Sequence, residues 1–443
     1  MSKNTHQTLL FKDFFRKKIE ADFAISETSS DGGLLVIREV ESSLGLIQRI
    51  VDTIHDKRHP SYVKHQTAEL LKQRVFQIIA GYEDANDCSF LRADPILKIA
   101  CESKESLASQ PTMTRFENSP GAKTLYRMGQ VLVEAFIKSY LKRPKAIILD
   151  IDDTGDLTYG NQQLSLFNTY HGGYCYMPIH IYEGTSGKII TTILRPGKRP
   201  SGKEIVSILK RIVKRLRRAW GKKVKILLRG DGHYSNPEVY DFCNANSIKF
   251  IFGFKAYSTV LEKATQLQDN AKELYQLRNK PIKLYDVFDY QAASWSQPRR
   301  VIVKAEYNSQ GSNTRFIVTN LKLNKIRFLY ETVYCGRGNM ELMIKEHKNH
   351  LSSGRTSCTG FAANQFRLFL HSMAYILLHT LRERYLSGTG FANSQFDTIR
   401  LRLIKIGTQV SNLKTKIKVH FPLSCPVQDD FYSIMRKINI LYG

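Results

Sequence analysis

Five polar or ionisable side chains recur at helical spacing in the second half of the chain. They are Tyr334, Arg337, Glu341, Lys345 and Lys348. Their gaps of 3, 4, 4 and 3 residues place them along one stripe of a single helix. An acid among basic side chains suits a carboxylate that binds a metal ion beside a phosphate, because the bases hold the anion and the acid holds the cation. A solvated helix face laced with salt bridges has the same spacing, so the stripe alone leaves both interpretations open.

Two further acidic sites follow apolar runs that we predict to be strands. Residues 146–152 form the first run and end in a group of carboxylates, whereas residues 224–228 form the second and lead into Asp231. Isolated acids are costly inside a sheet, so we expect them at strand ends, where a cation or water can meet them. On the first strand, Asp150 and Asp152 point to the same face because side chains alternate. Acids from three separate elements could therefore converge on a metal ion.

The elements between these acids indicate how they are positioned. A hairpin is predicted from residues 176–182 to residues 188–194, because turn-forming residues separate the two runs. An amphipathic helix follows, with Ser201 as its N-cap and Gly221 as its stop. The expected order is three strands, a helix, a strand and a later helix that carries Glu341. This α/β order resembles the ribonuclease-H-like core of nucleases and transposases, in which two strand-borne Asp and one helix-borne Glu bind two divalent ions.

Several motifs carry a resemblance to a known family. The pattern Tyr334-x2-Arg337-x3-Glu341-x6-Lys348 is similar to the Tyr-Arg-Glu-Lys signature of DDE transposases in the IS-four-like group of bacterial insertion sequences. Further segments across most of the chain resemble one branch of that group, the insertion-sequence family thirteen-eighty. They are Ser30-Asp-Gly-Gly33, Gly81-Tyr-Glu-Asp84, Leu149-Asp-Ile-Asp-Asp-Thr154, Gly173-Tyr174 with Met177-Pro178, Leu194-Arg-Pro-Gly197, Arg229-Gly-Asp231, and Gly354-Arg-Thr-Ser-Cys358 with Ala363-Asn-Gln-Phe-Arg367.

The resemblance implies a set of catalytic acids. Asp152, Asp231 and Glu341 would bind two Mg²⁺ ions, for which Mn²⁺ could substitute. The family pattern of an apolar run followed by Asp-x-Thr falls on residues 152–154, which assigns Asp152 as the first ligand and leaves Asp150 as the alternative. Hard cations with carboxylate ligands suit this chain better than zinc, because it has no Cys/His set.

The resemblance also implies DNA contacts on the same helix. Arg337, Lys345 and Lys348 would bind phosphates at the transposon end, while Tyr334 packs or hydrogen-bonds against the same backbone. The composition agrees with a nucleic-acid partner, since 66 Lys plus Arg against 40 Asp plus Glu give a net charge of +26. This charge alone does not separate DNA from RNA or from an anionic membrane.

Near the end of an N-terminal region that we predict to be mostly helical, residues 1–125, lies a second candidate DNA contact. Pro111 fits the first position of a helix capped by Ser109 or Gln110. Thr112, Thr114 and Arg115 would then stand near the exposed start of that helix, which is where helix-turn-helix proteins read the major groove. An ordinary capped surface helix is an equal alternative.

The chain length of 443 residues predicts two or three domains. We expect a helical DNA-end-binding region, a ribonuclease-H-like catalytic core in two segments, a β-rich insertion domain, and a basic C-terminal segment. The predicted ranges are residues 1–125 for the first, 140–245 and 326–390 for the core, 246–325 for the insertion, and 391–443 for the last.

The compartment is predicted from what the sequence lacks. Seven cysteines without a Cys-x-x-Cys pair argue against a zinc site or a disulfide framework and for a reducing compartment. The N-terminus has no secretory apolar core, and the most apolar stretch, residues 363–386, is interrupted by Arg and His. We therefore expect no membrane span and a bacterial, cytoplasmic, nucleoid-associated protein.

The predicted function is DNA transposition. The resemblance implies binding to terminal inverted repeats, two-metal-ion strand cleavage and strand transfer in a cut-and-paste reaction, with hairpin ends as one route it allows. Pairing two ends would need at least a homodimer on double-stranded DNA. Two alternatives remain open at this point, a catalytically inactive DNA-binding relic of a transposase and a related ribonuclease-H-like nuclease that acts on RNA.

Overall fold

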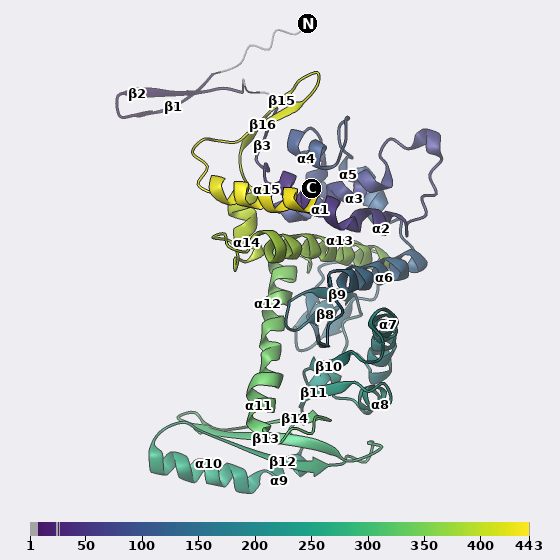
Figure 1. Cartoon of the computed structure of the whole chain (residues 1–443), viewed down its shortest axis with the longest axis vertical. Helices are drawn as coiled ribbons and strands as arrows, with labels where there is room; N and C mark the ends of the chain where they lie inside the picture. Colours follow the sequence, from purple (N-terminus) through teal and green to yellow (C-terminus); the bar gives the residue numbers. More distant parts are fainter. Residues whose placement is uncertain (1–7, 24, 26, 443) are drawn as a thin grey trace. The chain divides into compact units, whose positions relative to one another are not determined.

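The computed structural model describes residues 8–23, 25 and 27–442. The chain forms two compact units, each built from separated segments (Figure 1). The first unit comprises Met1–Leu44, Lys64–Met113 and Leu381–Gly443, and the second comprises Gly45–Val63 and Thr114–Thr380. This division differs from the predicted one, because the predicted C-terminal segment, residues 391–443, lies in one unit with N-terminal residues.

An eight-stranded mixed sheet runs through the second unit, in the order β12-β13-β14-β11-β10-β4-β8-β9. At its centre, β4 (Ala146–Asp153) pairs in parallel with β10 (Lys225–Gly230), which pairs in parallel with β11 (Lys249–Phe254). On its other edge, β4 pairs antiparallel with β8 (Ile179–Glu183), which forms a hairpin with β9 (Ile189–Ile193). The predicted strands and hairpin around the first two acids are therefore present.

The region predicted as an insertion, residues 246–325, does not build a sheet of its own. Its strands β12 (Ile282–Tyr290), β13 (Arg299–Asn308) and β14 (Gly311–Thr319) form an antiparallel meander. Strand β14 pairs antiparallel with β11, so the meander extends the central sheet. Helix α10 (Thr265–Arg278) packs on this extension. The side chain of Trp295 is buried in a hydrophobic cluster with apolar residues of β13 and β14.

Helices cover the sheet of the second unit. Helix α7 (Gly202–Trp220) begins with a capping box between Ser201 and Glu204 and ends at Gly221, which confirms both predicted boundaries. Its apolar residues pack in one cluster with the apolar residues of β4. The other elements of this unit are α2 (Leu46–Val51), α6 (Ala122–Lys138), α8 (Pro237–Ala245), α9 (Ser258–Glu262), α11 (Ile326–Phe328), α12 (Asn339–Lys345), α13 (Phe361–Thr380), and the small sheet of β5 (Asp156–Leu157), β6 (Leu166–Asn168) and β7 (Gly173–Tyr176). None of the described helices is long and apolar enough to cross a membrane.

In the first unit, one of the family-like motifs joins an N-terminal segment of the chain to a C-terminal segment. The backbone N–H groups of Gly32 and Gly33 donate to the carbonyls of Ile406 and Ile404, each at 3.0 Å. A Cβ at Gly33 would overlap the backbone of residues 403–404, so this close approach requires glycine. The Ser30–Gly33 motif thus fixes the C-terminal segment beside the N-terminal one.

A second motif completes that junction. The Tyr82 hydroxyl donates to Asp31 at 2.9 Å, and Lys405 Nζ lies 2.8 Å from the other oxygen of Asp31. Lys405 also lies over the Tyr82 ring.

The helices of this unit are α1 (Leu34–Leu44), α3 (Thr67–Ala80), α4 (Pro95–Ala100), α14 (Phe396–Ile399) and α15 (Gln428–Tyr442), and its strands are β1 (Leu9–Phe14), β2 (Lys17–Ala21), β3 (Thr28–Ser29), β15 (Thr408–Asn412) and β16 (Ile417–His420).

Candidate active site

Asp152 lies at the end of the central strand β4. Its carboxylate accepts a hydrogen bond from Arg337, with 2.8 Å between Asp152 Oδ2 and Arg337 Nη1. Burial raises the pKa of Asp152 to about 7; Arg337 opposes this rise, whereas the nearby Asp231 carboxylate adds to it. The two aspartates lie near the same ends of paired parallel strands, since Arg229 is opposite Asp150 in the register of β10 and β4.

Asp231 follows β10, which is the neighbour of β4 in the sheet. Its Oδ1 accepts a hydrogen bond at 2.8 Å from the backbone N–H of His233, so the side chain caps the turn that leaves the strand. The His233 ring lies 3.8 Å from the other oxygen of Asp231 and 3.3 Å from Asp153. The hydrogen bond to Asp153 raises the pKa of His233. As predicted, the ends of two adjacent strands bring Asp152 and Asp231 together.

The predicted helix with the stripe of five polar residues is continuous, but its geometry changes along its length. It is π-helical over Leu329–Tyr334, 3-10 helical over Cys335–Gly338, α-helical in α12 and π-helical again over Glu346–His350. Because these turns differ in pitch, the five side chains do not share one environment.

Glu341 stands in the first turn of α12, and its side chain is exposed. Electrostatic interactions connect the Arg337 guanidinium with Asp152, Asp231 and Glu341. Among the residues that the structure describes, no three His, Cys, Asp or Glu side chains are grouped closely enough to hold one metal ion. Among the described residues, the structure therefore does not group Glu341 with Asp152 and Asp231, and Arg337 contacts Asp152.

Lys348 is engaged inside the protein. Its Nζ lies 3.2 Å from Asp156 Oδ1 and donates to the Thr154 hydroxyl at 3.1 Å and to the Gly155 carbonyl. Burial raises the pKa of Asp156 to about 6, and Lys348 opposes that rise. These partners hold Lys348 against the loop that follows Asp152, whereas Lys345 is exposed. The predicted phosphate contacts of both residues stay predictions.

Tyr334 is half-buried between its own helix and β11. Its ring packs against Tyr330, with 5.8 Å between ring centroids. A Cβ at Gly253 would lie 2.8 Å from the Tyr334 hydroxyl, so only glycine admits this side chain beside the end of β11. Tyr334 therefore helps to seat the helix next to the two aspartates.

Asp150, the alternative first ligand, is fully buried and paired. Both of its oxygens accept hydrogen bonds from Arg229, each at 2.6 Å. Burial raises the pKa of Asp150, and the Arg229 guanidinium opposes that rise. Both oxygens of Asp150 are thus paired with Arg229, whereas those of Asp152 are not.

Arg229 was missed as a functional residue by sequence reasoning. Besides Asp150, it donates to the carbonyls of Val333 at 2.8 Å and Gly336 at 3.4 Å, in the helix that carries Arg337. It thus ties β4, β10 and that helix together. The available signal was an arginine directly after the apolar run of residues 224–228, because a buried arginine requires an anionic partner.

The predicted N-terminal DNA contacts lie on α5 (Gln110–Glu117). Arg115 is exposed, whereas Thr112 and Thr114 are half-buried. The Ser109 hydroxyl lies 3.3 Å from that of Thr112. The division between the two compact units falls within this helix. A DNA-reading role for these residues stays a prediction.

The donor chemistry of the site fits a hard divalent cation. Asp152 and Asp231 present carboxylate oxygens, the ligands that Mg²⁺ and Mn²⁺ prefer. Beside them, Asp153 Oδ2 is buried and has no hydrogen-bond partner among the described residues. The raised pKa of Asp152 indicates that the local positive charge does not fully compensate its burial. A cation held by Asp152 and Asp231 would supply that compensation.

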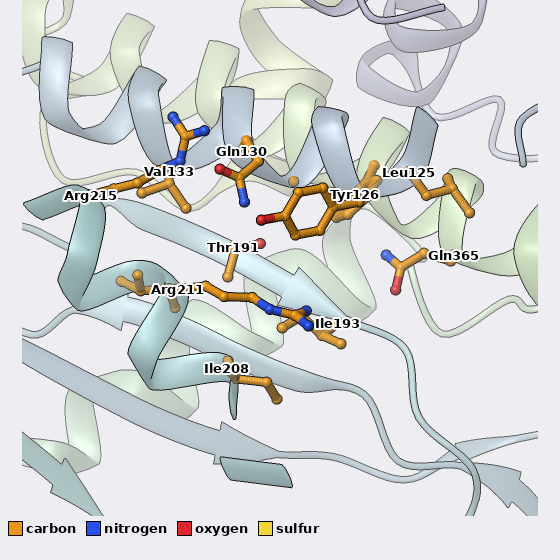
Figure 2. Close-up of a pocket in the computed structure, with 13 residues that line it drawn as sticks. Leu125, Tyr126, Gln130, Val133, Thr191, Ile193, Ile208, Arg211, Arg215 and Gln365 are labelled. Atoms are coloured by element: carbon orange, nitrogen blue, oxygen red, sulfur yellow. The ribbon is translucent and has the colours of Figure 1, made fainter. Parts of the chain in front are cut away.

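A pocket of about 220 Å³ lies elsewhere in this unit, between α6, α7 and β9 (Figure 2). Figure 2 shows Tyr126 and Gln130 of α6 above Thr191 of β9, with Arg211 and Arg215 of α7 at one side. The rest of the wall is mostly apolar. No predicted site residue lines this pocket.

Both the sequence and the structure have similarities to known proteins. A family model described as "Transposase DDE domain group 1" matches residues 11–442. No curated protein matches the chain. Among solved structures, the cryo-EM structure of a piggyBac transposase synaptic complex with hairpin DNA is similar, with a TM-score of 0.42 and 9% sequence identity over 85% of this chain and 80% of that chain.

Proposed function

Because the chain belongs to the family of DDE-domain transposases in group 1, we propose that it cleaves and joins DNA at the ends of an insertion sequence. The observation that carries this proposal is the position of Asp152 and Asp231 at the ends of adjacent parallel strands, in a chain that matches the family over residues 11–442. In this assignment both residues are catalytic metal ligands, and Glu341 is the third.

The strand order supports a ribonuclease-H-like core. Strands β9, β8, β4, β10 and β11 are neighbours in that order, so the first strand in sequence is central and the fourth lies beside it in parallel. Asp152 ends the first of these five strands, Asp231 follows the fourth, and Glu341 stands on a later helix. This is the order of acids predicted for such a core.

The residues divide the chemistry between them. When bound, two Mg²⁺ ions activate the attacking water or 3′-hydroxyl and stabilise the leaving oxygen. Asp152 and Asp231 would hold them, and Glu341 would complete the set. Arg337 contacts Asp152 through Nη1, so a phosphate placed beside that carboxylate could accept from its remaining N–H groups.

The substrate in this proposal is double-stranded DNA that bears terminal inverted repeats. The Tyr-Arg-Glu-Lys signature and the motifs shared with the insertion-sequence family thirteen-eighty support bacterial, cut-and-paste movement, with hairpin ends as one route. Synapsis of two ends requires a homodimer or a larger assembly. Exposed Lys345 and Arg115 are the proposed phosphate contacts, while Arg337 acts at the scissile phosphate.

A matched pair of substitutions tests the assignment. Glu341→Gln removes one acid charge from α12, and Glu273→Gln removes one from the exposed face of α10. We expect Glu341→Gln to abolish Mg²⁺-dependent cleavage and to retain binding to the repeat DNA, whereas Glu273→Gln retains both. Cleavage by the Glu341→Gln protein at the rate of wild type would exclude Glu341 from the catalytic set.

A further inference from the structure

The outer surface of α7 carries an array of cations without acids. No Asp or Glu occurs between Glu204 and Asp231, and the segment in between contains a dense run of Lys and Arg. Glu204 itself is used in the capping box and in an ion pair with Arg195. The positive charge of this face is therefore not neutralised within the helix.

Three of the cations form a regular row. Lys210, Lys214 and Arg218 are exposed, and no ion pair involves them within the described residues. Their spacing of four residues puts them on one stripe that spans ~12 Å along the helix. One strand of duplex DNA places a phosphate every ~3.4 Å along its axis, so the row matches about three or four phosphates.

Neighbouring side chains are arranged around this row. Arg215 pairs with Glu134 of α6, and the Arg211 guanidinium lies over the Tyr126 ring. The row lines a groove of about 800 Å³ between α6 and α7, with Glu134 as its one acidic lining residue. Arg211 and Arg215 also reach the adjoining pocket of Figure 2. The groove is thus a preformed cationic surface.

This groove and the candidate active site lie on opposite faces of the sheet. Ile147, Leu149 and Ile151 of β4 pack in the cluster that contains the apolar residues of α7. Since side chains alternate along a strand, Asp150 and Asp152 point to the other face, where Arg337 meets Asp152. The sheet separates α7 from α12, as Figure 1 shows. A duplex at Asp152 and a duplex along α7 would therefore meet different faces of the sheet.

We infer that the groove between α6 and α7 binds the phosphate backbone of a second DNA duplex, distinct from the one at the active site. The inference rests on the proposed function, which supplies the active-site duplex. Lys210, Lys214 and Arg218 provide the phosphate contacts, and the contact is independent of base sequence because it uses the backbone alone.

The test compares two triple charge reversals in the full chain. Lys210→Glu with Lys214→Glu and Arg218→Glu alters the groove. The control, Lys272→Glu with Arg278→Glu and Lys280→Glu, makes the same change in net charge on and just after α10, where Asp269 and Glu273 interrupt the cations. Each protein is first saturated with an unlabelled duplex that carries the repeat, and a labelled duplex of unrelated sequence is then titrated at several salt concentrations.

We expect wild type and the control to bind the second duplex, and the groove variant to lose this binding. The slope of log affinity against log salt should fall in magnitude by about 3 in the groove variant, since each phosphate contact contributes ~0.9. Equal binding and equal slopes in all three proteins would overturn the inference and leave an acidic protein as the alternative partner. The inference would also be overturned if the groove variant lost binding only when the repeat and the unrelated sequence were joined in one long duplex. In that case the groove would bind the DNA that is cleaved.

The same proteins separate this inference from the proposed function. Single-turnover cleavage of the repeat duplex should be unchanged in the groove variant. Failure of wild type to cleave would refute the proposed function, whereas the titration with the second duplex would still decide the role of the groove.

Discussion

Removal of Arg229 should be one of the most costly single changes in the second unit. Arg229→Met leaves the fully buried Asp150 without its two hydrogen bonds, and the carbonyls of Val333 and Gly336 lose a donor. Removing one partner of a buried ion pair typically costs about 3–5 kcal/mol. The change should also release the helix that carries Arg337 and Glu341 from β10.

Arg300→Met is the matched control. Arg300 lies on β13, in the same unit, and donates to the carbonyls of Leu321 and Leu323; it forms no ion pair among the described residues. Its loss should cost only about 1 kcal/mol per hydrogen bond. The difference between the two substitutions therefore isolates the cost of the unpaired Asp150 carboxylate.

Tryptophan fluorescence during urea unfolding measures these effects selectively. The chain has two tryptophans, Trp220 and Trp295, and both lie in the second unit. A double-mutant cycle with Asp150→Asn should give a coupling free energy of roughly 2–3 kcal/mol, because the double variant leaves no buried charge. If Arg229→Met costs no more than Arg300→Met, or if the two substitutions are additive, the proposed anchor is refuted.

Two further predictions concern the site and its support. Mg²⁺ binding should release about one proton at pH 6 and almost none at pH 8, because Asp152 keeps its proton up to a pKa of about 7 and must lose it to bind a cation. The same raised pKa means that the folded, metal-free protein binds more protons than the unfolded chain between about pH 4 and 7. Its stability should therefore fall as the pH rises through that range. Calorimetry in two buffers of different ionisation enthalpy measures this release, and equal values at both pH values would contradict it. Gly336→Ala should destabilise the second unit by about 1–3 kcal/mol, because the added Cβ would meet Arg229 Nη1 at 2.8 Å. Gly338→Ala is the matched control: its Cβ would enter open space, so it should stabilise the unit by about 0.5–1 kcal/mol. Equal shifts in the urea midpoint would show that Arg229 does not pack there.

Local signals in the sequence were sufficient for the elements around the site. The apolar runs before Asp152 and Asp231 form strands, and Ser201 and Gly221 bound α7. These features depend on neighbours in sequence, so periodicity and capping chemistry specify them.

Local sequence signals did not predict the contacts between segments that are far apart in the chain. Strand β12 was not predicted, and the joining of β14 to β11 depends on which strand edges meet in space. The side chain of Lys348 contacts Asp156, which is 192 residues away in the chain, so residue spacing within the helix does not reveal this partner. The role of Asp150 depends on Arg229, which lies 79 residues away in the chain. Residue spacing predicted the helix that carries Glu341. Contacts with residues on other elements determine which of its side chains are exposed.

Mg²⁺-dependent nicking of labelled DNA that carries the repeats flanking the gene is the decisive test of Asp152 and Asp231 as catalytic residues. Wild type and Asp231→Asn should be compared, because the substitution removes one of the two paired carboxylates while its amide oxygen can still cap the turn at His233. We expect cleavage at the repeat boundary by wild type alone, with repeat binding by both proteins. Binding without cleavage by wild type, or equal cleavage by both proteins, would contradict it.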